Sequence, residues 1–381
     1  MLMRRQVGTQ PDEAGTVQGG RKWLRRLLAS AGGALFGLLT SLYSAELREI
    51  VEASGRGLIS TGLPVVITAV VASVSGVLIY ELGFRRRYRG AVTEGEIGIR
   101  ADALDGVIHD EDAVVGRSMR YLETRRFTED LVVFLHGLGL DADDFRPYMS
   151  ESRFHCVALT LYGFNADERD DEHYRPISLE SHVQLVGYAL RRLQARYPHK
   201  RITLVGFSFG ADMILCLREF APDVLTELRP HRVVLLDPNI NNTTTTISSR
   251  IADIDNDRSL RDLVGVLRSA KTSQEFRYLC EYLSKITSKN FAHVRRHARE
   301  MSDRYRQRSF GPFLDWVGRL RRETAEGVYV TLSLDHEEVF NAVVRAAAAR
   351  GLDVNRLECS RTDHFDLMGQ DFLRTELEHP R

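Results

Sequence analysis

The feature that most constrains the fold of this chain is an alternation of short hydrophobic runs and helical segments after residue 128. The runs are rich in β-branched residues, which is typical of buried strands; they cover residues 131–135, 154–160, 201–206, 232–237, 328–334 and a last stretch near 353–359. Apolar residues spaced three and four apart predict helices between them, at residues 179–196, about 208–220 and 337–350. Such alternation predicts an α/β domain over residues 128–381, with a mostly parallel sheet covered by helices on both faces.

The composition narrows the possible partners and cofactors. The 381 residues include 52 Lys and Arg against 52 Asp and Glu, so no excess of positive charge favours a nucleic-acid partner. The four cysteines are Cys156, Cys216, Cys280 and Cys359. They lack C-x-x-C spacing, so they indicate neither a zinc site nor a disulfide framework. We therefore expect no nucleic acid, no metal and no cofactor, and the sequence leaves the oligomeric state open.

Two uncharged runs near the amino end predict a membrane anchor over residues 21–90. Residues 57–80 form 24 consecutive positions without a charge, and residues 27–45 form another 19. About 20 apolar residues suffice to cross a bilayer as a helix, so a hairpin of two transmembrane helices is expected. A signal peptide is the rival interpretation, but no small-x-small cleavage site follows the first run. A buried pair of core helices is the other alternative.

The positive charges around these runs predict their orientation. Arg21, Lys22, Arg25 and Arg26 precede the first run, and Arg85, Arg86, Arg87 and Arg89 follow the second. The connecting loop has only two arginines. Because cytoplasmic flanks are enriched in Lys and Arg, both flanks and the large domain are expected in the cytoplasm, beside the bilayer. Residues 1–20 read as a disordered tail, and residues 91–127 as a linker or extension.

A glycine-flanked serine follows one of the predicted strands. Gly206-Phe207-Ser208-Phe209-Gly210 lies between the run 201–206 and the next predicted helix, which is the context of a nucleophile elbow. There a strained turn presents the serine hydroxyl at the carboxyl end of the sheet, and the glycines leave room for crowded neighbours. We expect Ser208 to be a nucleophile; the alternative is an ordinary strand-to-helix turn with a capping serine.

A second loop predicts an oxyanion hole. His136-Gly137-Leu138-Gly139 follows the run 131–135. A backbone N–H in such a loop, here that of Leu138, can point to the same place as the N–H of Phe209. We expect these two amides to bind a developing oxyanion, and His136 to hold the loop rather than act as a base.

The carboxyl-terminal part supplies an acid and a base. Asp335 follows the run 328–334, and His364 follows the last predicted strand, which completes the chain order Ser208, Asp335, His364. Asp237 also ends a strand and is the alternative acid. We favour Asp335, and interpret His336, Asp363 and Asp366 as supporting or surface groups.

With these motifs, residues 128–375 resemble the α/β-hydrolase family. The resemblance implies that the histidine takes the serine proton, that the aspartate orients the histidine, and that an acyl-enzyme forms. It also implies that residues 238–320 form a helical cap over the site.

The expected function is that of a membrane-anchored serine hydrolase. An ester or thioester is the expected substrate, with a lipid or other small acyl compound favoured by the proximity of the bilayer. The alternatives are a catalytically silent hydrolase-like module that binds or signals at the membrane, and a peptidase or acyltransferase that uses the same serine.

Overall fold

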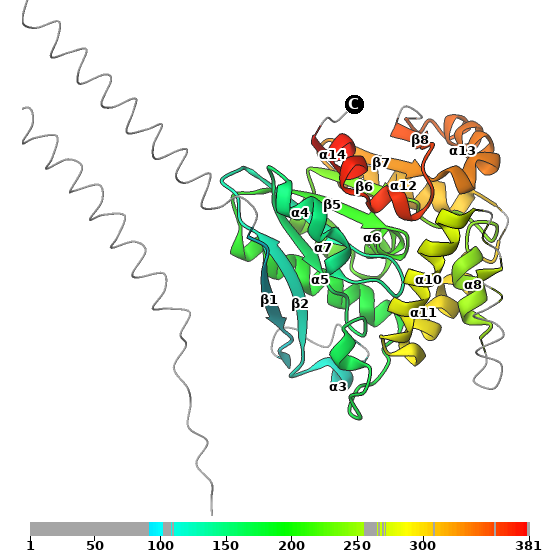
Figure 1. Cartoon of the computed structure of the whole chain (residues 1–381). Coiled ribbons are helices and arrows are strands. Elements are labelled where there is room, and N and C mark those ends of the chain that lie inside the picture. Colours follow the sequence, from blue (N-terminus) through cyan, green and yellow to red (C-terminus); the bar gives the residue numbers. More distant parts are fainter. Residues whose placement is uncertain are drawn as a thin grey trace, which may run out of the picture. The chain divides into compact units, whose positions relative to one another are not determined.

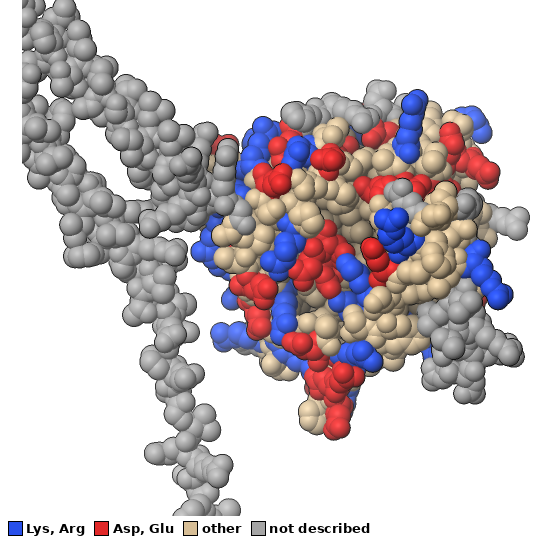
Figure 2. Space-filling model, in the orientation of Figure 1, with Lys and Arg blue, Asp and Glu red and all other residues tan. Residues whose placement is uncertain are grey.

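The computed structural model describes residues 91–378, except for 102–107, 109, 255–264, 266, 269, 271, 308 and 354–355. The predicted tail at 1–20 and the two predicted membrane helices at 27–45 and 57–80 lie outside these residues. Among the described helices, none combines the length and the apolar character needed to span a bilayer. On the face drawn in Figure 2, basic and acidic side chains are interspersed.

An eight-stranded sheet forms the centre of the described domain (Figure 1), in the order β1-β2-β4-β3-β5-β6-β7-β8. The strands are β1 (Thr93–Gly98), β2 (Ser118–Thr124), β3 (Asp130–Leu135), β4 (His155–Leu159), β5 (Arg201–Phe207), β6 (Arg232–Leu236), β7 (Gly327–Leu332) and β8 (Leu357–Cys359). Every pairing from β4 to β8 is parallel, whereas β1 pairs with β2, and β2 with β4, in antiparallel fashion. The structure thus confirms the predicted mostly parallel α/β sheet.

The helices fall into two sets according to their contacts. In one set, α4 (Arg146–Glu151) packs against α14 (Gln370–Glu378). In the other, α5 (Leu179–Arg196), α6 (Phe209–Phe220), α12 (Gly311–Arg322) and α13 (Glu337–Ala349) contact one another in succession. The shorter elements are α3 (Glu111–Val114), η2 (Ala142–Phe145), η3 (Ala166–Glu168), α7 (Pro222–Leu228), η4 (Leu334–His336) and η6 (Phe365–Met368).

The strands at the centre of the sheet are hydrophobic on both faces because helices cover both. All five residues of β4 and of β6 are buried, as are Leu131 to Leu135 of β3. Strand β1, at the edge of the sheet, and its neighbour β2 instead mix polar and apolar residues. They form within the stretch that the sequence left as a linker or extension, because its charged residues hide the strand pattern.

The chain between β6 and β7 is helical, as the cap prediction requires. It contains α8 (Thr246–Ala252), α10 (Ser273–Thr287), α11 (Phe291–Arg304) and α12. Helix α11 contacts both α8 and α10, whereas α12 packs against α6 and β7. We use the name cap helices for α8, α10 and α11, since α12 belongs to the layer that covers the sheet.

Candidate active site

Ser208 occupies a strained turn between β5 and α6. Its φ of 51° and ψ of −118° lie in a region that residues other than glycine seldom adopt. The Ser208 N–H donates to the carbonyl of Leu236 at 2.8 Å, and its own carbonyl accepts from the amides of Ala211 and Asp212. These bonds to β6 and α6 hold the turn, and the serine side chain remains partly exposed.

The two glycines of the motif are required by close backbone contacts. A Cβ at Gly206 would lie 2.6 Å from the backbone of Ala211 in α6. A Cβ at Gly210 would lie 2.2 Å from the carbonyl oxygen of Leu135 in β3. Neither backbone atom can move without shifting a helix or a strand, so the elbow needs glycine at both positions.

His364 is hydrogen-bonded to a buried aspartate at the carboxyl end of β6. The distance from His364 Nδ1 to Asp237 Oδ2 is 2.5 Å. A carboxylate can only accept, so Nδ1 carries the ring proton and Nε2 keeps its lone pair. The imidazole also packs against Phe207, the residue before the serine, with ring centroids 4.7 Å apart. His364 therefore lies beside the turn that contains Ser208. Among the described residues, Ser208 makes no hydrogen bond to His364. Such catalytic hydrogen bonds often form only when substrate is bound.

The surroundings of Asp237 keep its carboxylate ionised. Burial alone would raise its pKa. His336, whose Nε2 lies 3.6 Å from Oδ1, together with the bond to His364 and the amide of Ser333 at 2.7 Å, outweighs burial and lowers the pKa of Asp237. The residue itself has a φ of 50°, so a second strained position supports the site.

The hydrogen bond of His364 goes to Asp237 and not to Asp335, the acid favoured from the sequence. Asp335 lies in the turn η4 beyond β7, is exposed, and makes no hydrogen bond or ion pair with His364 within the described part of the chain. The turn instead brings Ser333 and His336 against Asp237. His336 is therefore a supporting group, as expected, and the geometry favours the alternative acid.

The expected oxyanion amides lie at the ends of two neighbouring strands. Leu138 follows β3, and Phe209 is the first residue of α6. The backbone N–H groups of both residues are unused in the hydrogen bonds of the described chain. Both side chains are buried, so the residues are held in place while their amides remain available.

His136 holds the loop that contains Leu138, as predicted. Its Nε2 accepts from the amide of Leu161 at 3.0 Å, so Nδ1 carries the proton and donates to the carbonyl of Gly137 at 2.8 Å. Burial lowers the pKa of His136 to about 4, and the ring is neutral. It therefore joins the loop after β3 to the loop after β4.

Helix α10 contacts both loops that flank the serine. A Cβ on Gly139 would lie 2.5 Å from Cγ1 of Ile286, so this side chain of α10 packs directly on the Gly139 backbone, whose φ is +77°. Tyr282 packs against Phe365 with ring centroids 5.3 Å apart, and the Tyr278 hydroxyl donates to Asp366 Oδ1 at 2.6 Å. One cap helix therefore spans from the Leu138 loop to the His364 loop.

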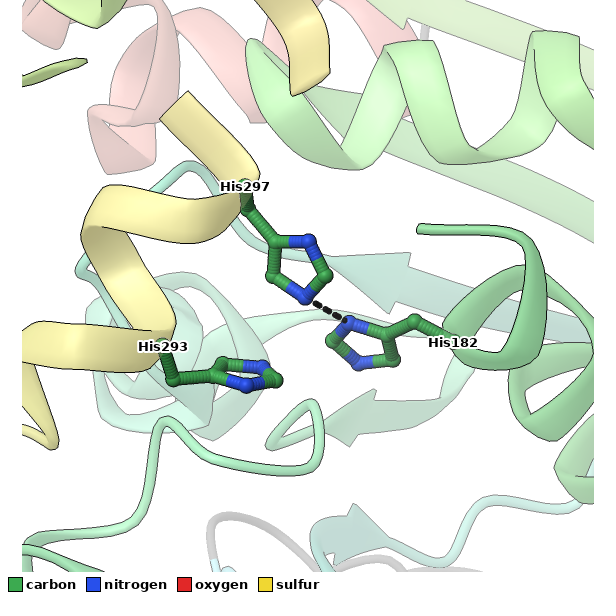
Figure 3. Close-up of side chains that lie close together, drawn as sticks. All are labelled: His182, His293 and His297. Atoms are coloured by element: carbon green, nitrogen blue, oxygen red, sulfur yellow. Dashed lines mark hydrogen bonds between the residues drawn. The ribbon is translucent and has the colours of Figure 1, made fainter. Parts of the chain in front are cut away.

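A cluster of three histidines was not anticipated from the sequence. His182 of α5 and His293 and His297 of α11 point toward one another (Figure 3), with one nitrogen of each within 4.8 Å of the others. The spacing of four residues between His293 and His297 on one helix was an available signal, because it places both rings on one face. His182 is 115 residues away from His297 in the chain, and only the fold brings it there.

Comparisons with solved structures give low identities. A membrane phospholipase A, described as a bacterial virulence factor, is 15% identical, with 81% of this chain and 94% of that chain covered and a TM-score of 0.44. MenH from S. aureus is 13% identical, with coverages of 68% and 96% and a TM-score of 0.48. Est816, an enzyme that degrades N-acyl homoserine lactones, is 16% identical, with coverages of 69% and 96% and a TM-score of 0.47.

Family membership rests on the sequence of the described domain. No curated protein matches the chain. The model of the alpha/beta hydrolase family matches residues 132–371, which include β3, the serine turn, the cap helices and His364. Since this match covers more than half of the sequence, the chain belongs to the alpha/beta hydrolase family.

Proposed function

We propose that the protein is a serine hydrolase that cleaves a carboxylic ester or thioester through Ser208, His364 and Asp237. The observation that carries the proposal is the 2.5 Å bond from His364 to the buried Asp237, beside a serine held in a strained elbow. An aspartate in this position fixes the imidazole tautomer and stabilises the cation that forms during catalysis.

The proposed reaction proceeds in two steps. His364 Nε2 accepts the proton of Ser208 Oγ as the oxygen forms a bond to the substrate carbonyl carbon, and the carbonyl oxygen becomes an anion bound by the amides of Leu138 and Phe209. When the anion collapses, the bond to the leaving alcohol or thiol breaks, and His364 donates the proton to it. Water then attacks the acyl-enzyme in the same way and releases the acid and free Ser208.

The proposed substrate is a lipid or another small acyl compound met at the cytoplasmic face of a membrane. This part of the proposal rests on the sequence, where the uncharged runs 27–45 and 57–80 are long enough for two spans and are flanked by Lys and Arg. A domain tethered in this way meets substrates that partition into the bilayer.

Labelling and a substrate series test the chemistry. The full chain, purified in detergent, should react with a fluorophosphonate and should hydrolyse p-nitrophenyl esters, with longer acyl chains preferred. Ser208→Ala should abolish the labelling, whereas Ser284→Ala, which changes an exposed serine of α10, should not. Absence of both labelling and turnover in the native protein would favour a silent binding module.

Fusions of reporter proteins test the topology separately. Fluorescent reporters that mature only in the cytoplasm should be bright after Arg89 and after Arg381, and alkaline phosphatase should be inactive at the same points. A charge at the centre of a span costs about 2.5–3.5 kcal/mol on the translocon scale, so Val70→Arg should weaken insertion and Ala53→Arg should not. An external carboxyl end would refute the orientation.

A further inference from the structure

The histidine cluster joins the cap to the helical layer of the sheet. His182 lies on α5, and His293 and His297 lie one turn apart on α11, so the three rings converge from two helices (Figure 3). All three residues are completely buried. The ring of Phe164 packs at 5.4 Å from that of His293, and the ring of Phe209 packs at 5.4 Å from that of His297. The cluster therefore lies in an apolar environment that water does not reach from the surface.

Several polar atoms of the cluster lack partners. His182 Nε2, both nitrogens of His293 and the hydroxyl of Tyr174 are buried and make no hydrogen bond among the described residues. Buried polar groups are nearly always satisfied, because leaving one unpaired costs its desolvation energy. Four such atoms in one place indicate that a ligand belongs between them.

The bonds around His297 prepare one of its nitrogens to bind a ligand. His297 Nδ1 donates to Glu300 Oε2 at 3.1 Å. Glu300 is itself held by the amide of Leu179 at 2.9 Å and by Arg296 Nε at 3.2 Å. The proton of His297 is thus fixed on Nδ1, and its Nε2 accepts a hydrogen bond from His182 Nδ1 at 2.9 Å (Figure 3), which a metal bound to Nε2 would replace. A carboxylate behind a histidine in this way is the usual support of a metal-ligating imidazole.

We propose that His182, His293 and His297 bind one zinc ion, which fastens cap helix α11 to α5. Three imidazoles with a fourth position for water form a set of ligands that zinc accepts, and neither thiolates nor carboxylates compete at the centre. Three nitrogens that lie within 4.8 Å of one another have a common centre no more than about 2.8 Å from each, so rotations that move each by roughly 0.7 Å or less reach the zinc–nitrogen distance of about 2.0–2.1 Å.

Glycine at position 163 leaves room for two side chains of the cluster region. Gly163 has a φ of +86°, and a Cβ there would lie 2.1 Å from the Tyr174 hydroxyl and 2.6 Å from His293 Nε2. Both groups therefore lie close to the Gly163 backbone. The Tyr174 hydroxyl is placed to hydrogen-bond a water on the fourth position of the ion.

The role of this zinc is structural. The ion would be completely buried, whereas Ser208 and His364 are partly exposed. It lies behind Phe209, whose backbone amide is one of the two proposed oxyanion donors, so it stabilises the wall of the active site without touching the substrate. The inference stands on the cluster alone and holds whether or not Ser208 is a nucleophile.

Metal content tests the proposal directly. The full chain, purified in detergent and dialysed against EDTA, is analysed by inductively coupled plasma mass spectrometry. The native protein should retain about one zinc per chain, because a closed structural site releases its ion slowly. His293→Gln should retain less than about a tenth of this amount, whereas His199→Gln, which changes an exposed histidine, should match the native protein.

A cobalt-substituted native protein makes the test independent of variants. Protein produced with Co²⁺ in place of zinc should show the intense visible absorption of a tetrahedral site, and Tm should fall in protein prepared without metal. Native protein that holds no metal and gives no cobalt absorption would overturn the proposal, as would equal zinc in His293→Gln. The cluster would then be a set of packed neutral histidines.

Discussion

Two regions of the molecule each contain a histidine hydrogen-bonded to a carboxylate, and we assign a different role to each pair. At the carboxyl edge of the sheet, His364 donates through Nδ1 to Asp237; between the cap and α5, His297 donates through Nδ1 to Glu300. In both pairs the carboxylate fixes the proton on Nδ1, so Nε2 keeps its lone pair. The ring of His364 packs against Phe207 beside the partly exposed Ser208, whereas Nε2 of His297 accepts from the buried His182. The comparison teaches that the neighbours of the second nitrogen, and not the pair itself, decide the chemistry.

The largest expected effect on the rate of ester hydrolysis comes from removing the hydroxyl of Ser208, the proposed nucleophile. Ser208→Ala should lower ester hydrolysis by roughly 10⁴–10⁶, because it removes the nucleophile and leaves only binding and the oxyanion amides. Zinc content should stay unchanged, since the serine does not touch the histidine cluster. Single-turnover measurements with a p-nitrophenyl ester check the rate, and native turnover in the variant would remove Ser208 from the mechanism.

The next effect separates the two candidate acids. Asp237→Asn should lower the rate by about 10⁴, because an amide no longer holds the proton of His364 on Nδ1. Asp335→Asn is the matched control and should change the rate little, since Asp335 is exposed and takes no part in that bond. The measurement is kcat on the same ester. A large loss in Asp335→Asn, with a small one in Asp237→Asn, would restore the original assignment.

The corresponding change in the second pair should leave catalysis nearly intact. Glu300→Gln should weaken zinc binding by about 10–100-fold, as expected for a carboxylate that supports a metal-bound histidine. Competition with a chromophoric chelator measures the affinity, and Glu338→Gln, at an exposed position of α13, is the control. If turnover falls as far as it does in Asp237→Asn while zinc affinity is unchanged, the two regions are not independent.

The smallest expected effect concerns a third histidine–carboxylate pair, whose contribution to the stability of the fold depends on pH. His155 Nε2, on β4, lies 3.0 Å from Glu123 Oε1, on the neighbouring strand β2. Burial would raise the pKa of Glu123, but bonds to His155 and Tyr197 and the nearby Arg125 and Arg196 lower it to about 2.

The sign of this dependence follows from the lowered pKa. A carboxyl whose pKa is lower in the folded than in the unfolded protein stabilises the fold above about pH 4.3, and this stability is lost as the pH falls toward 2. Glu123→Gln should therefore lower Tm at pH 7, by a few degrees, and the difference from the native protein should shrink below about pH 4. Thermal unfolding between pH 2 and 7 checks this, and a constant difference would contradict the assigned pKa.

Much of the fold could be predicted because its signals are local. The runs that became β3, β5 and β6 are hydrophobic on both faces, and a pattern of this kind requires burial wherever the strand lies. The signal for the serine turn is equally local, because the five residues from Gly206 to Gly210 are contiguous, although the contact that requires Gly210 is with Leu135 of β3. Strands β1 and β2 escaped prediction because both mix charged and apolar residues, and the pairing of Glu123 with His155 becomes apparent only in three dimensions.

The sequence could not decide between the two candidate acids, and it could not predict the histidine cluster. Asp237 and Asp335 both follow strands that lie side by side, so the rule that an acid follows a strand applies equally to both. What separates them is the backbone at each position: Asp237 itself has a φ of 50° and is buried, whereas Asp335 lies in a 3₁₀ turn and is exposed. His182 and His293 likewise become neighbours only when α11 packs on the domain.

The position of α10 makes the two loops beside the serine one cooperative unit. Ile286 of the helix packs on Gly139 and Tyr282 packs on Phe365, and Lys289, two residues beyond the helix, forms an ion pair with Asp141 at 2.5 Å. These loops are more than two hundred residues apart in the chain, yet both pack against α10. Their backbone amides should therefore exchange with deuterated solvent through one shared opening event, whose frequency sets how often a substrate reaches Ser208.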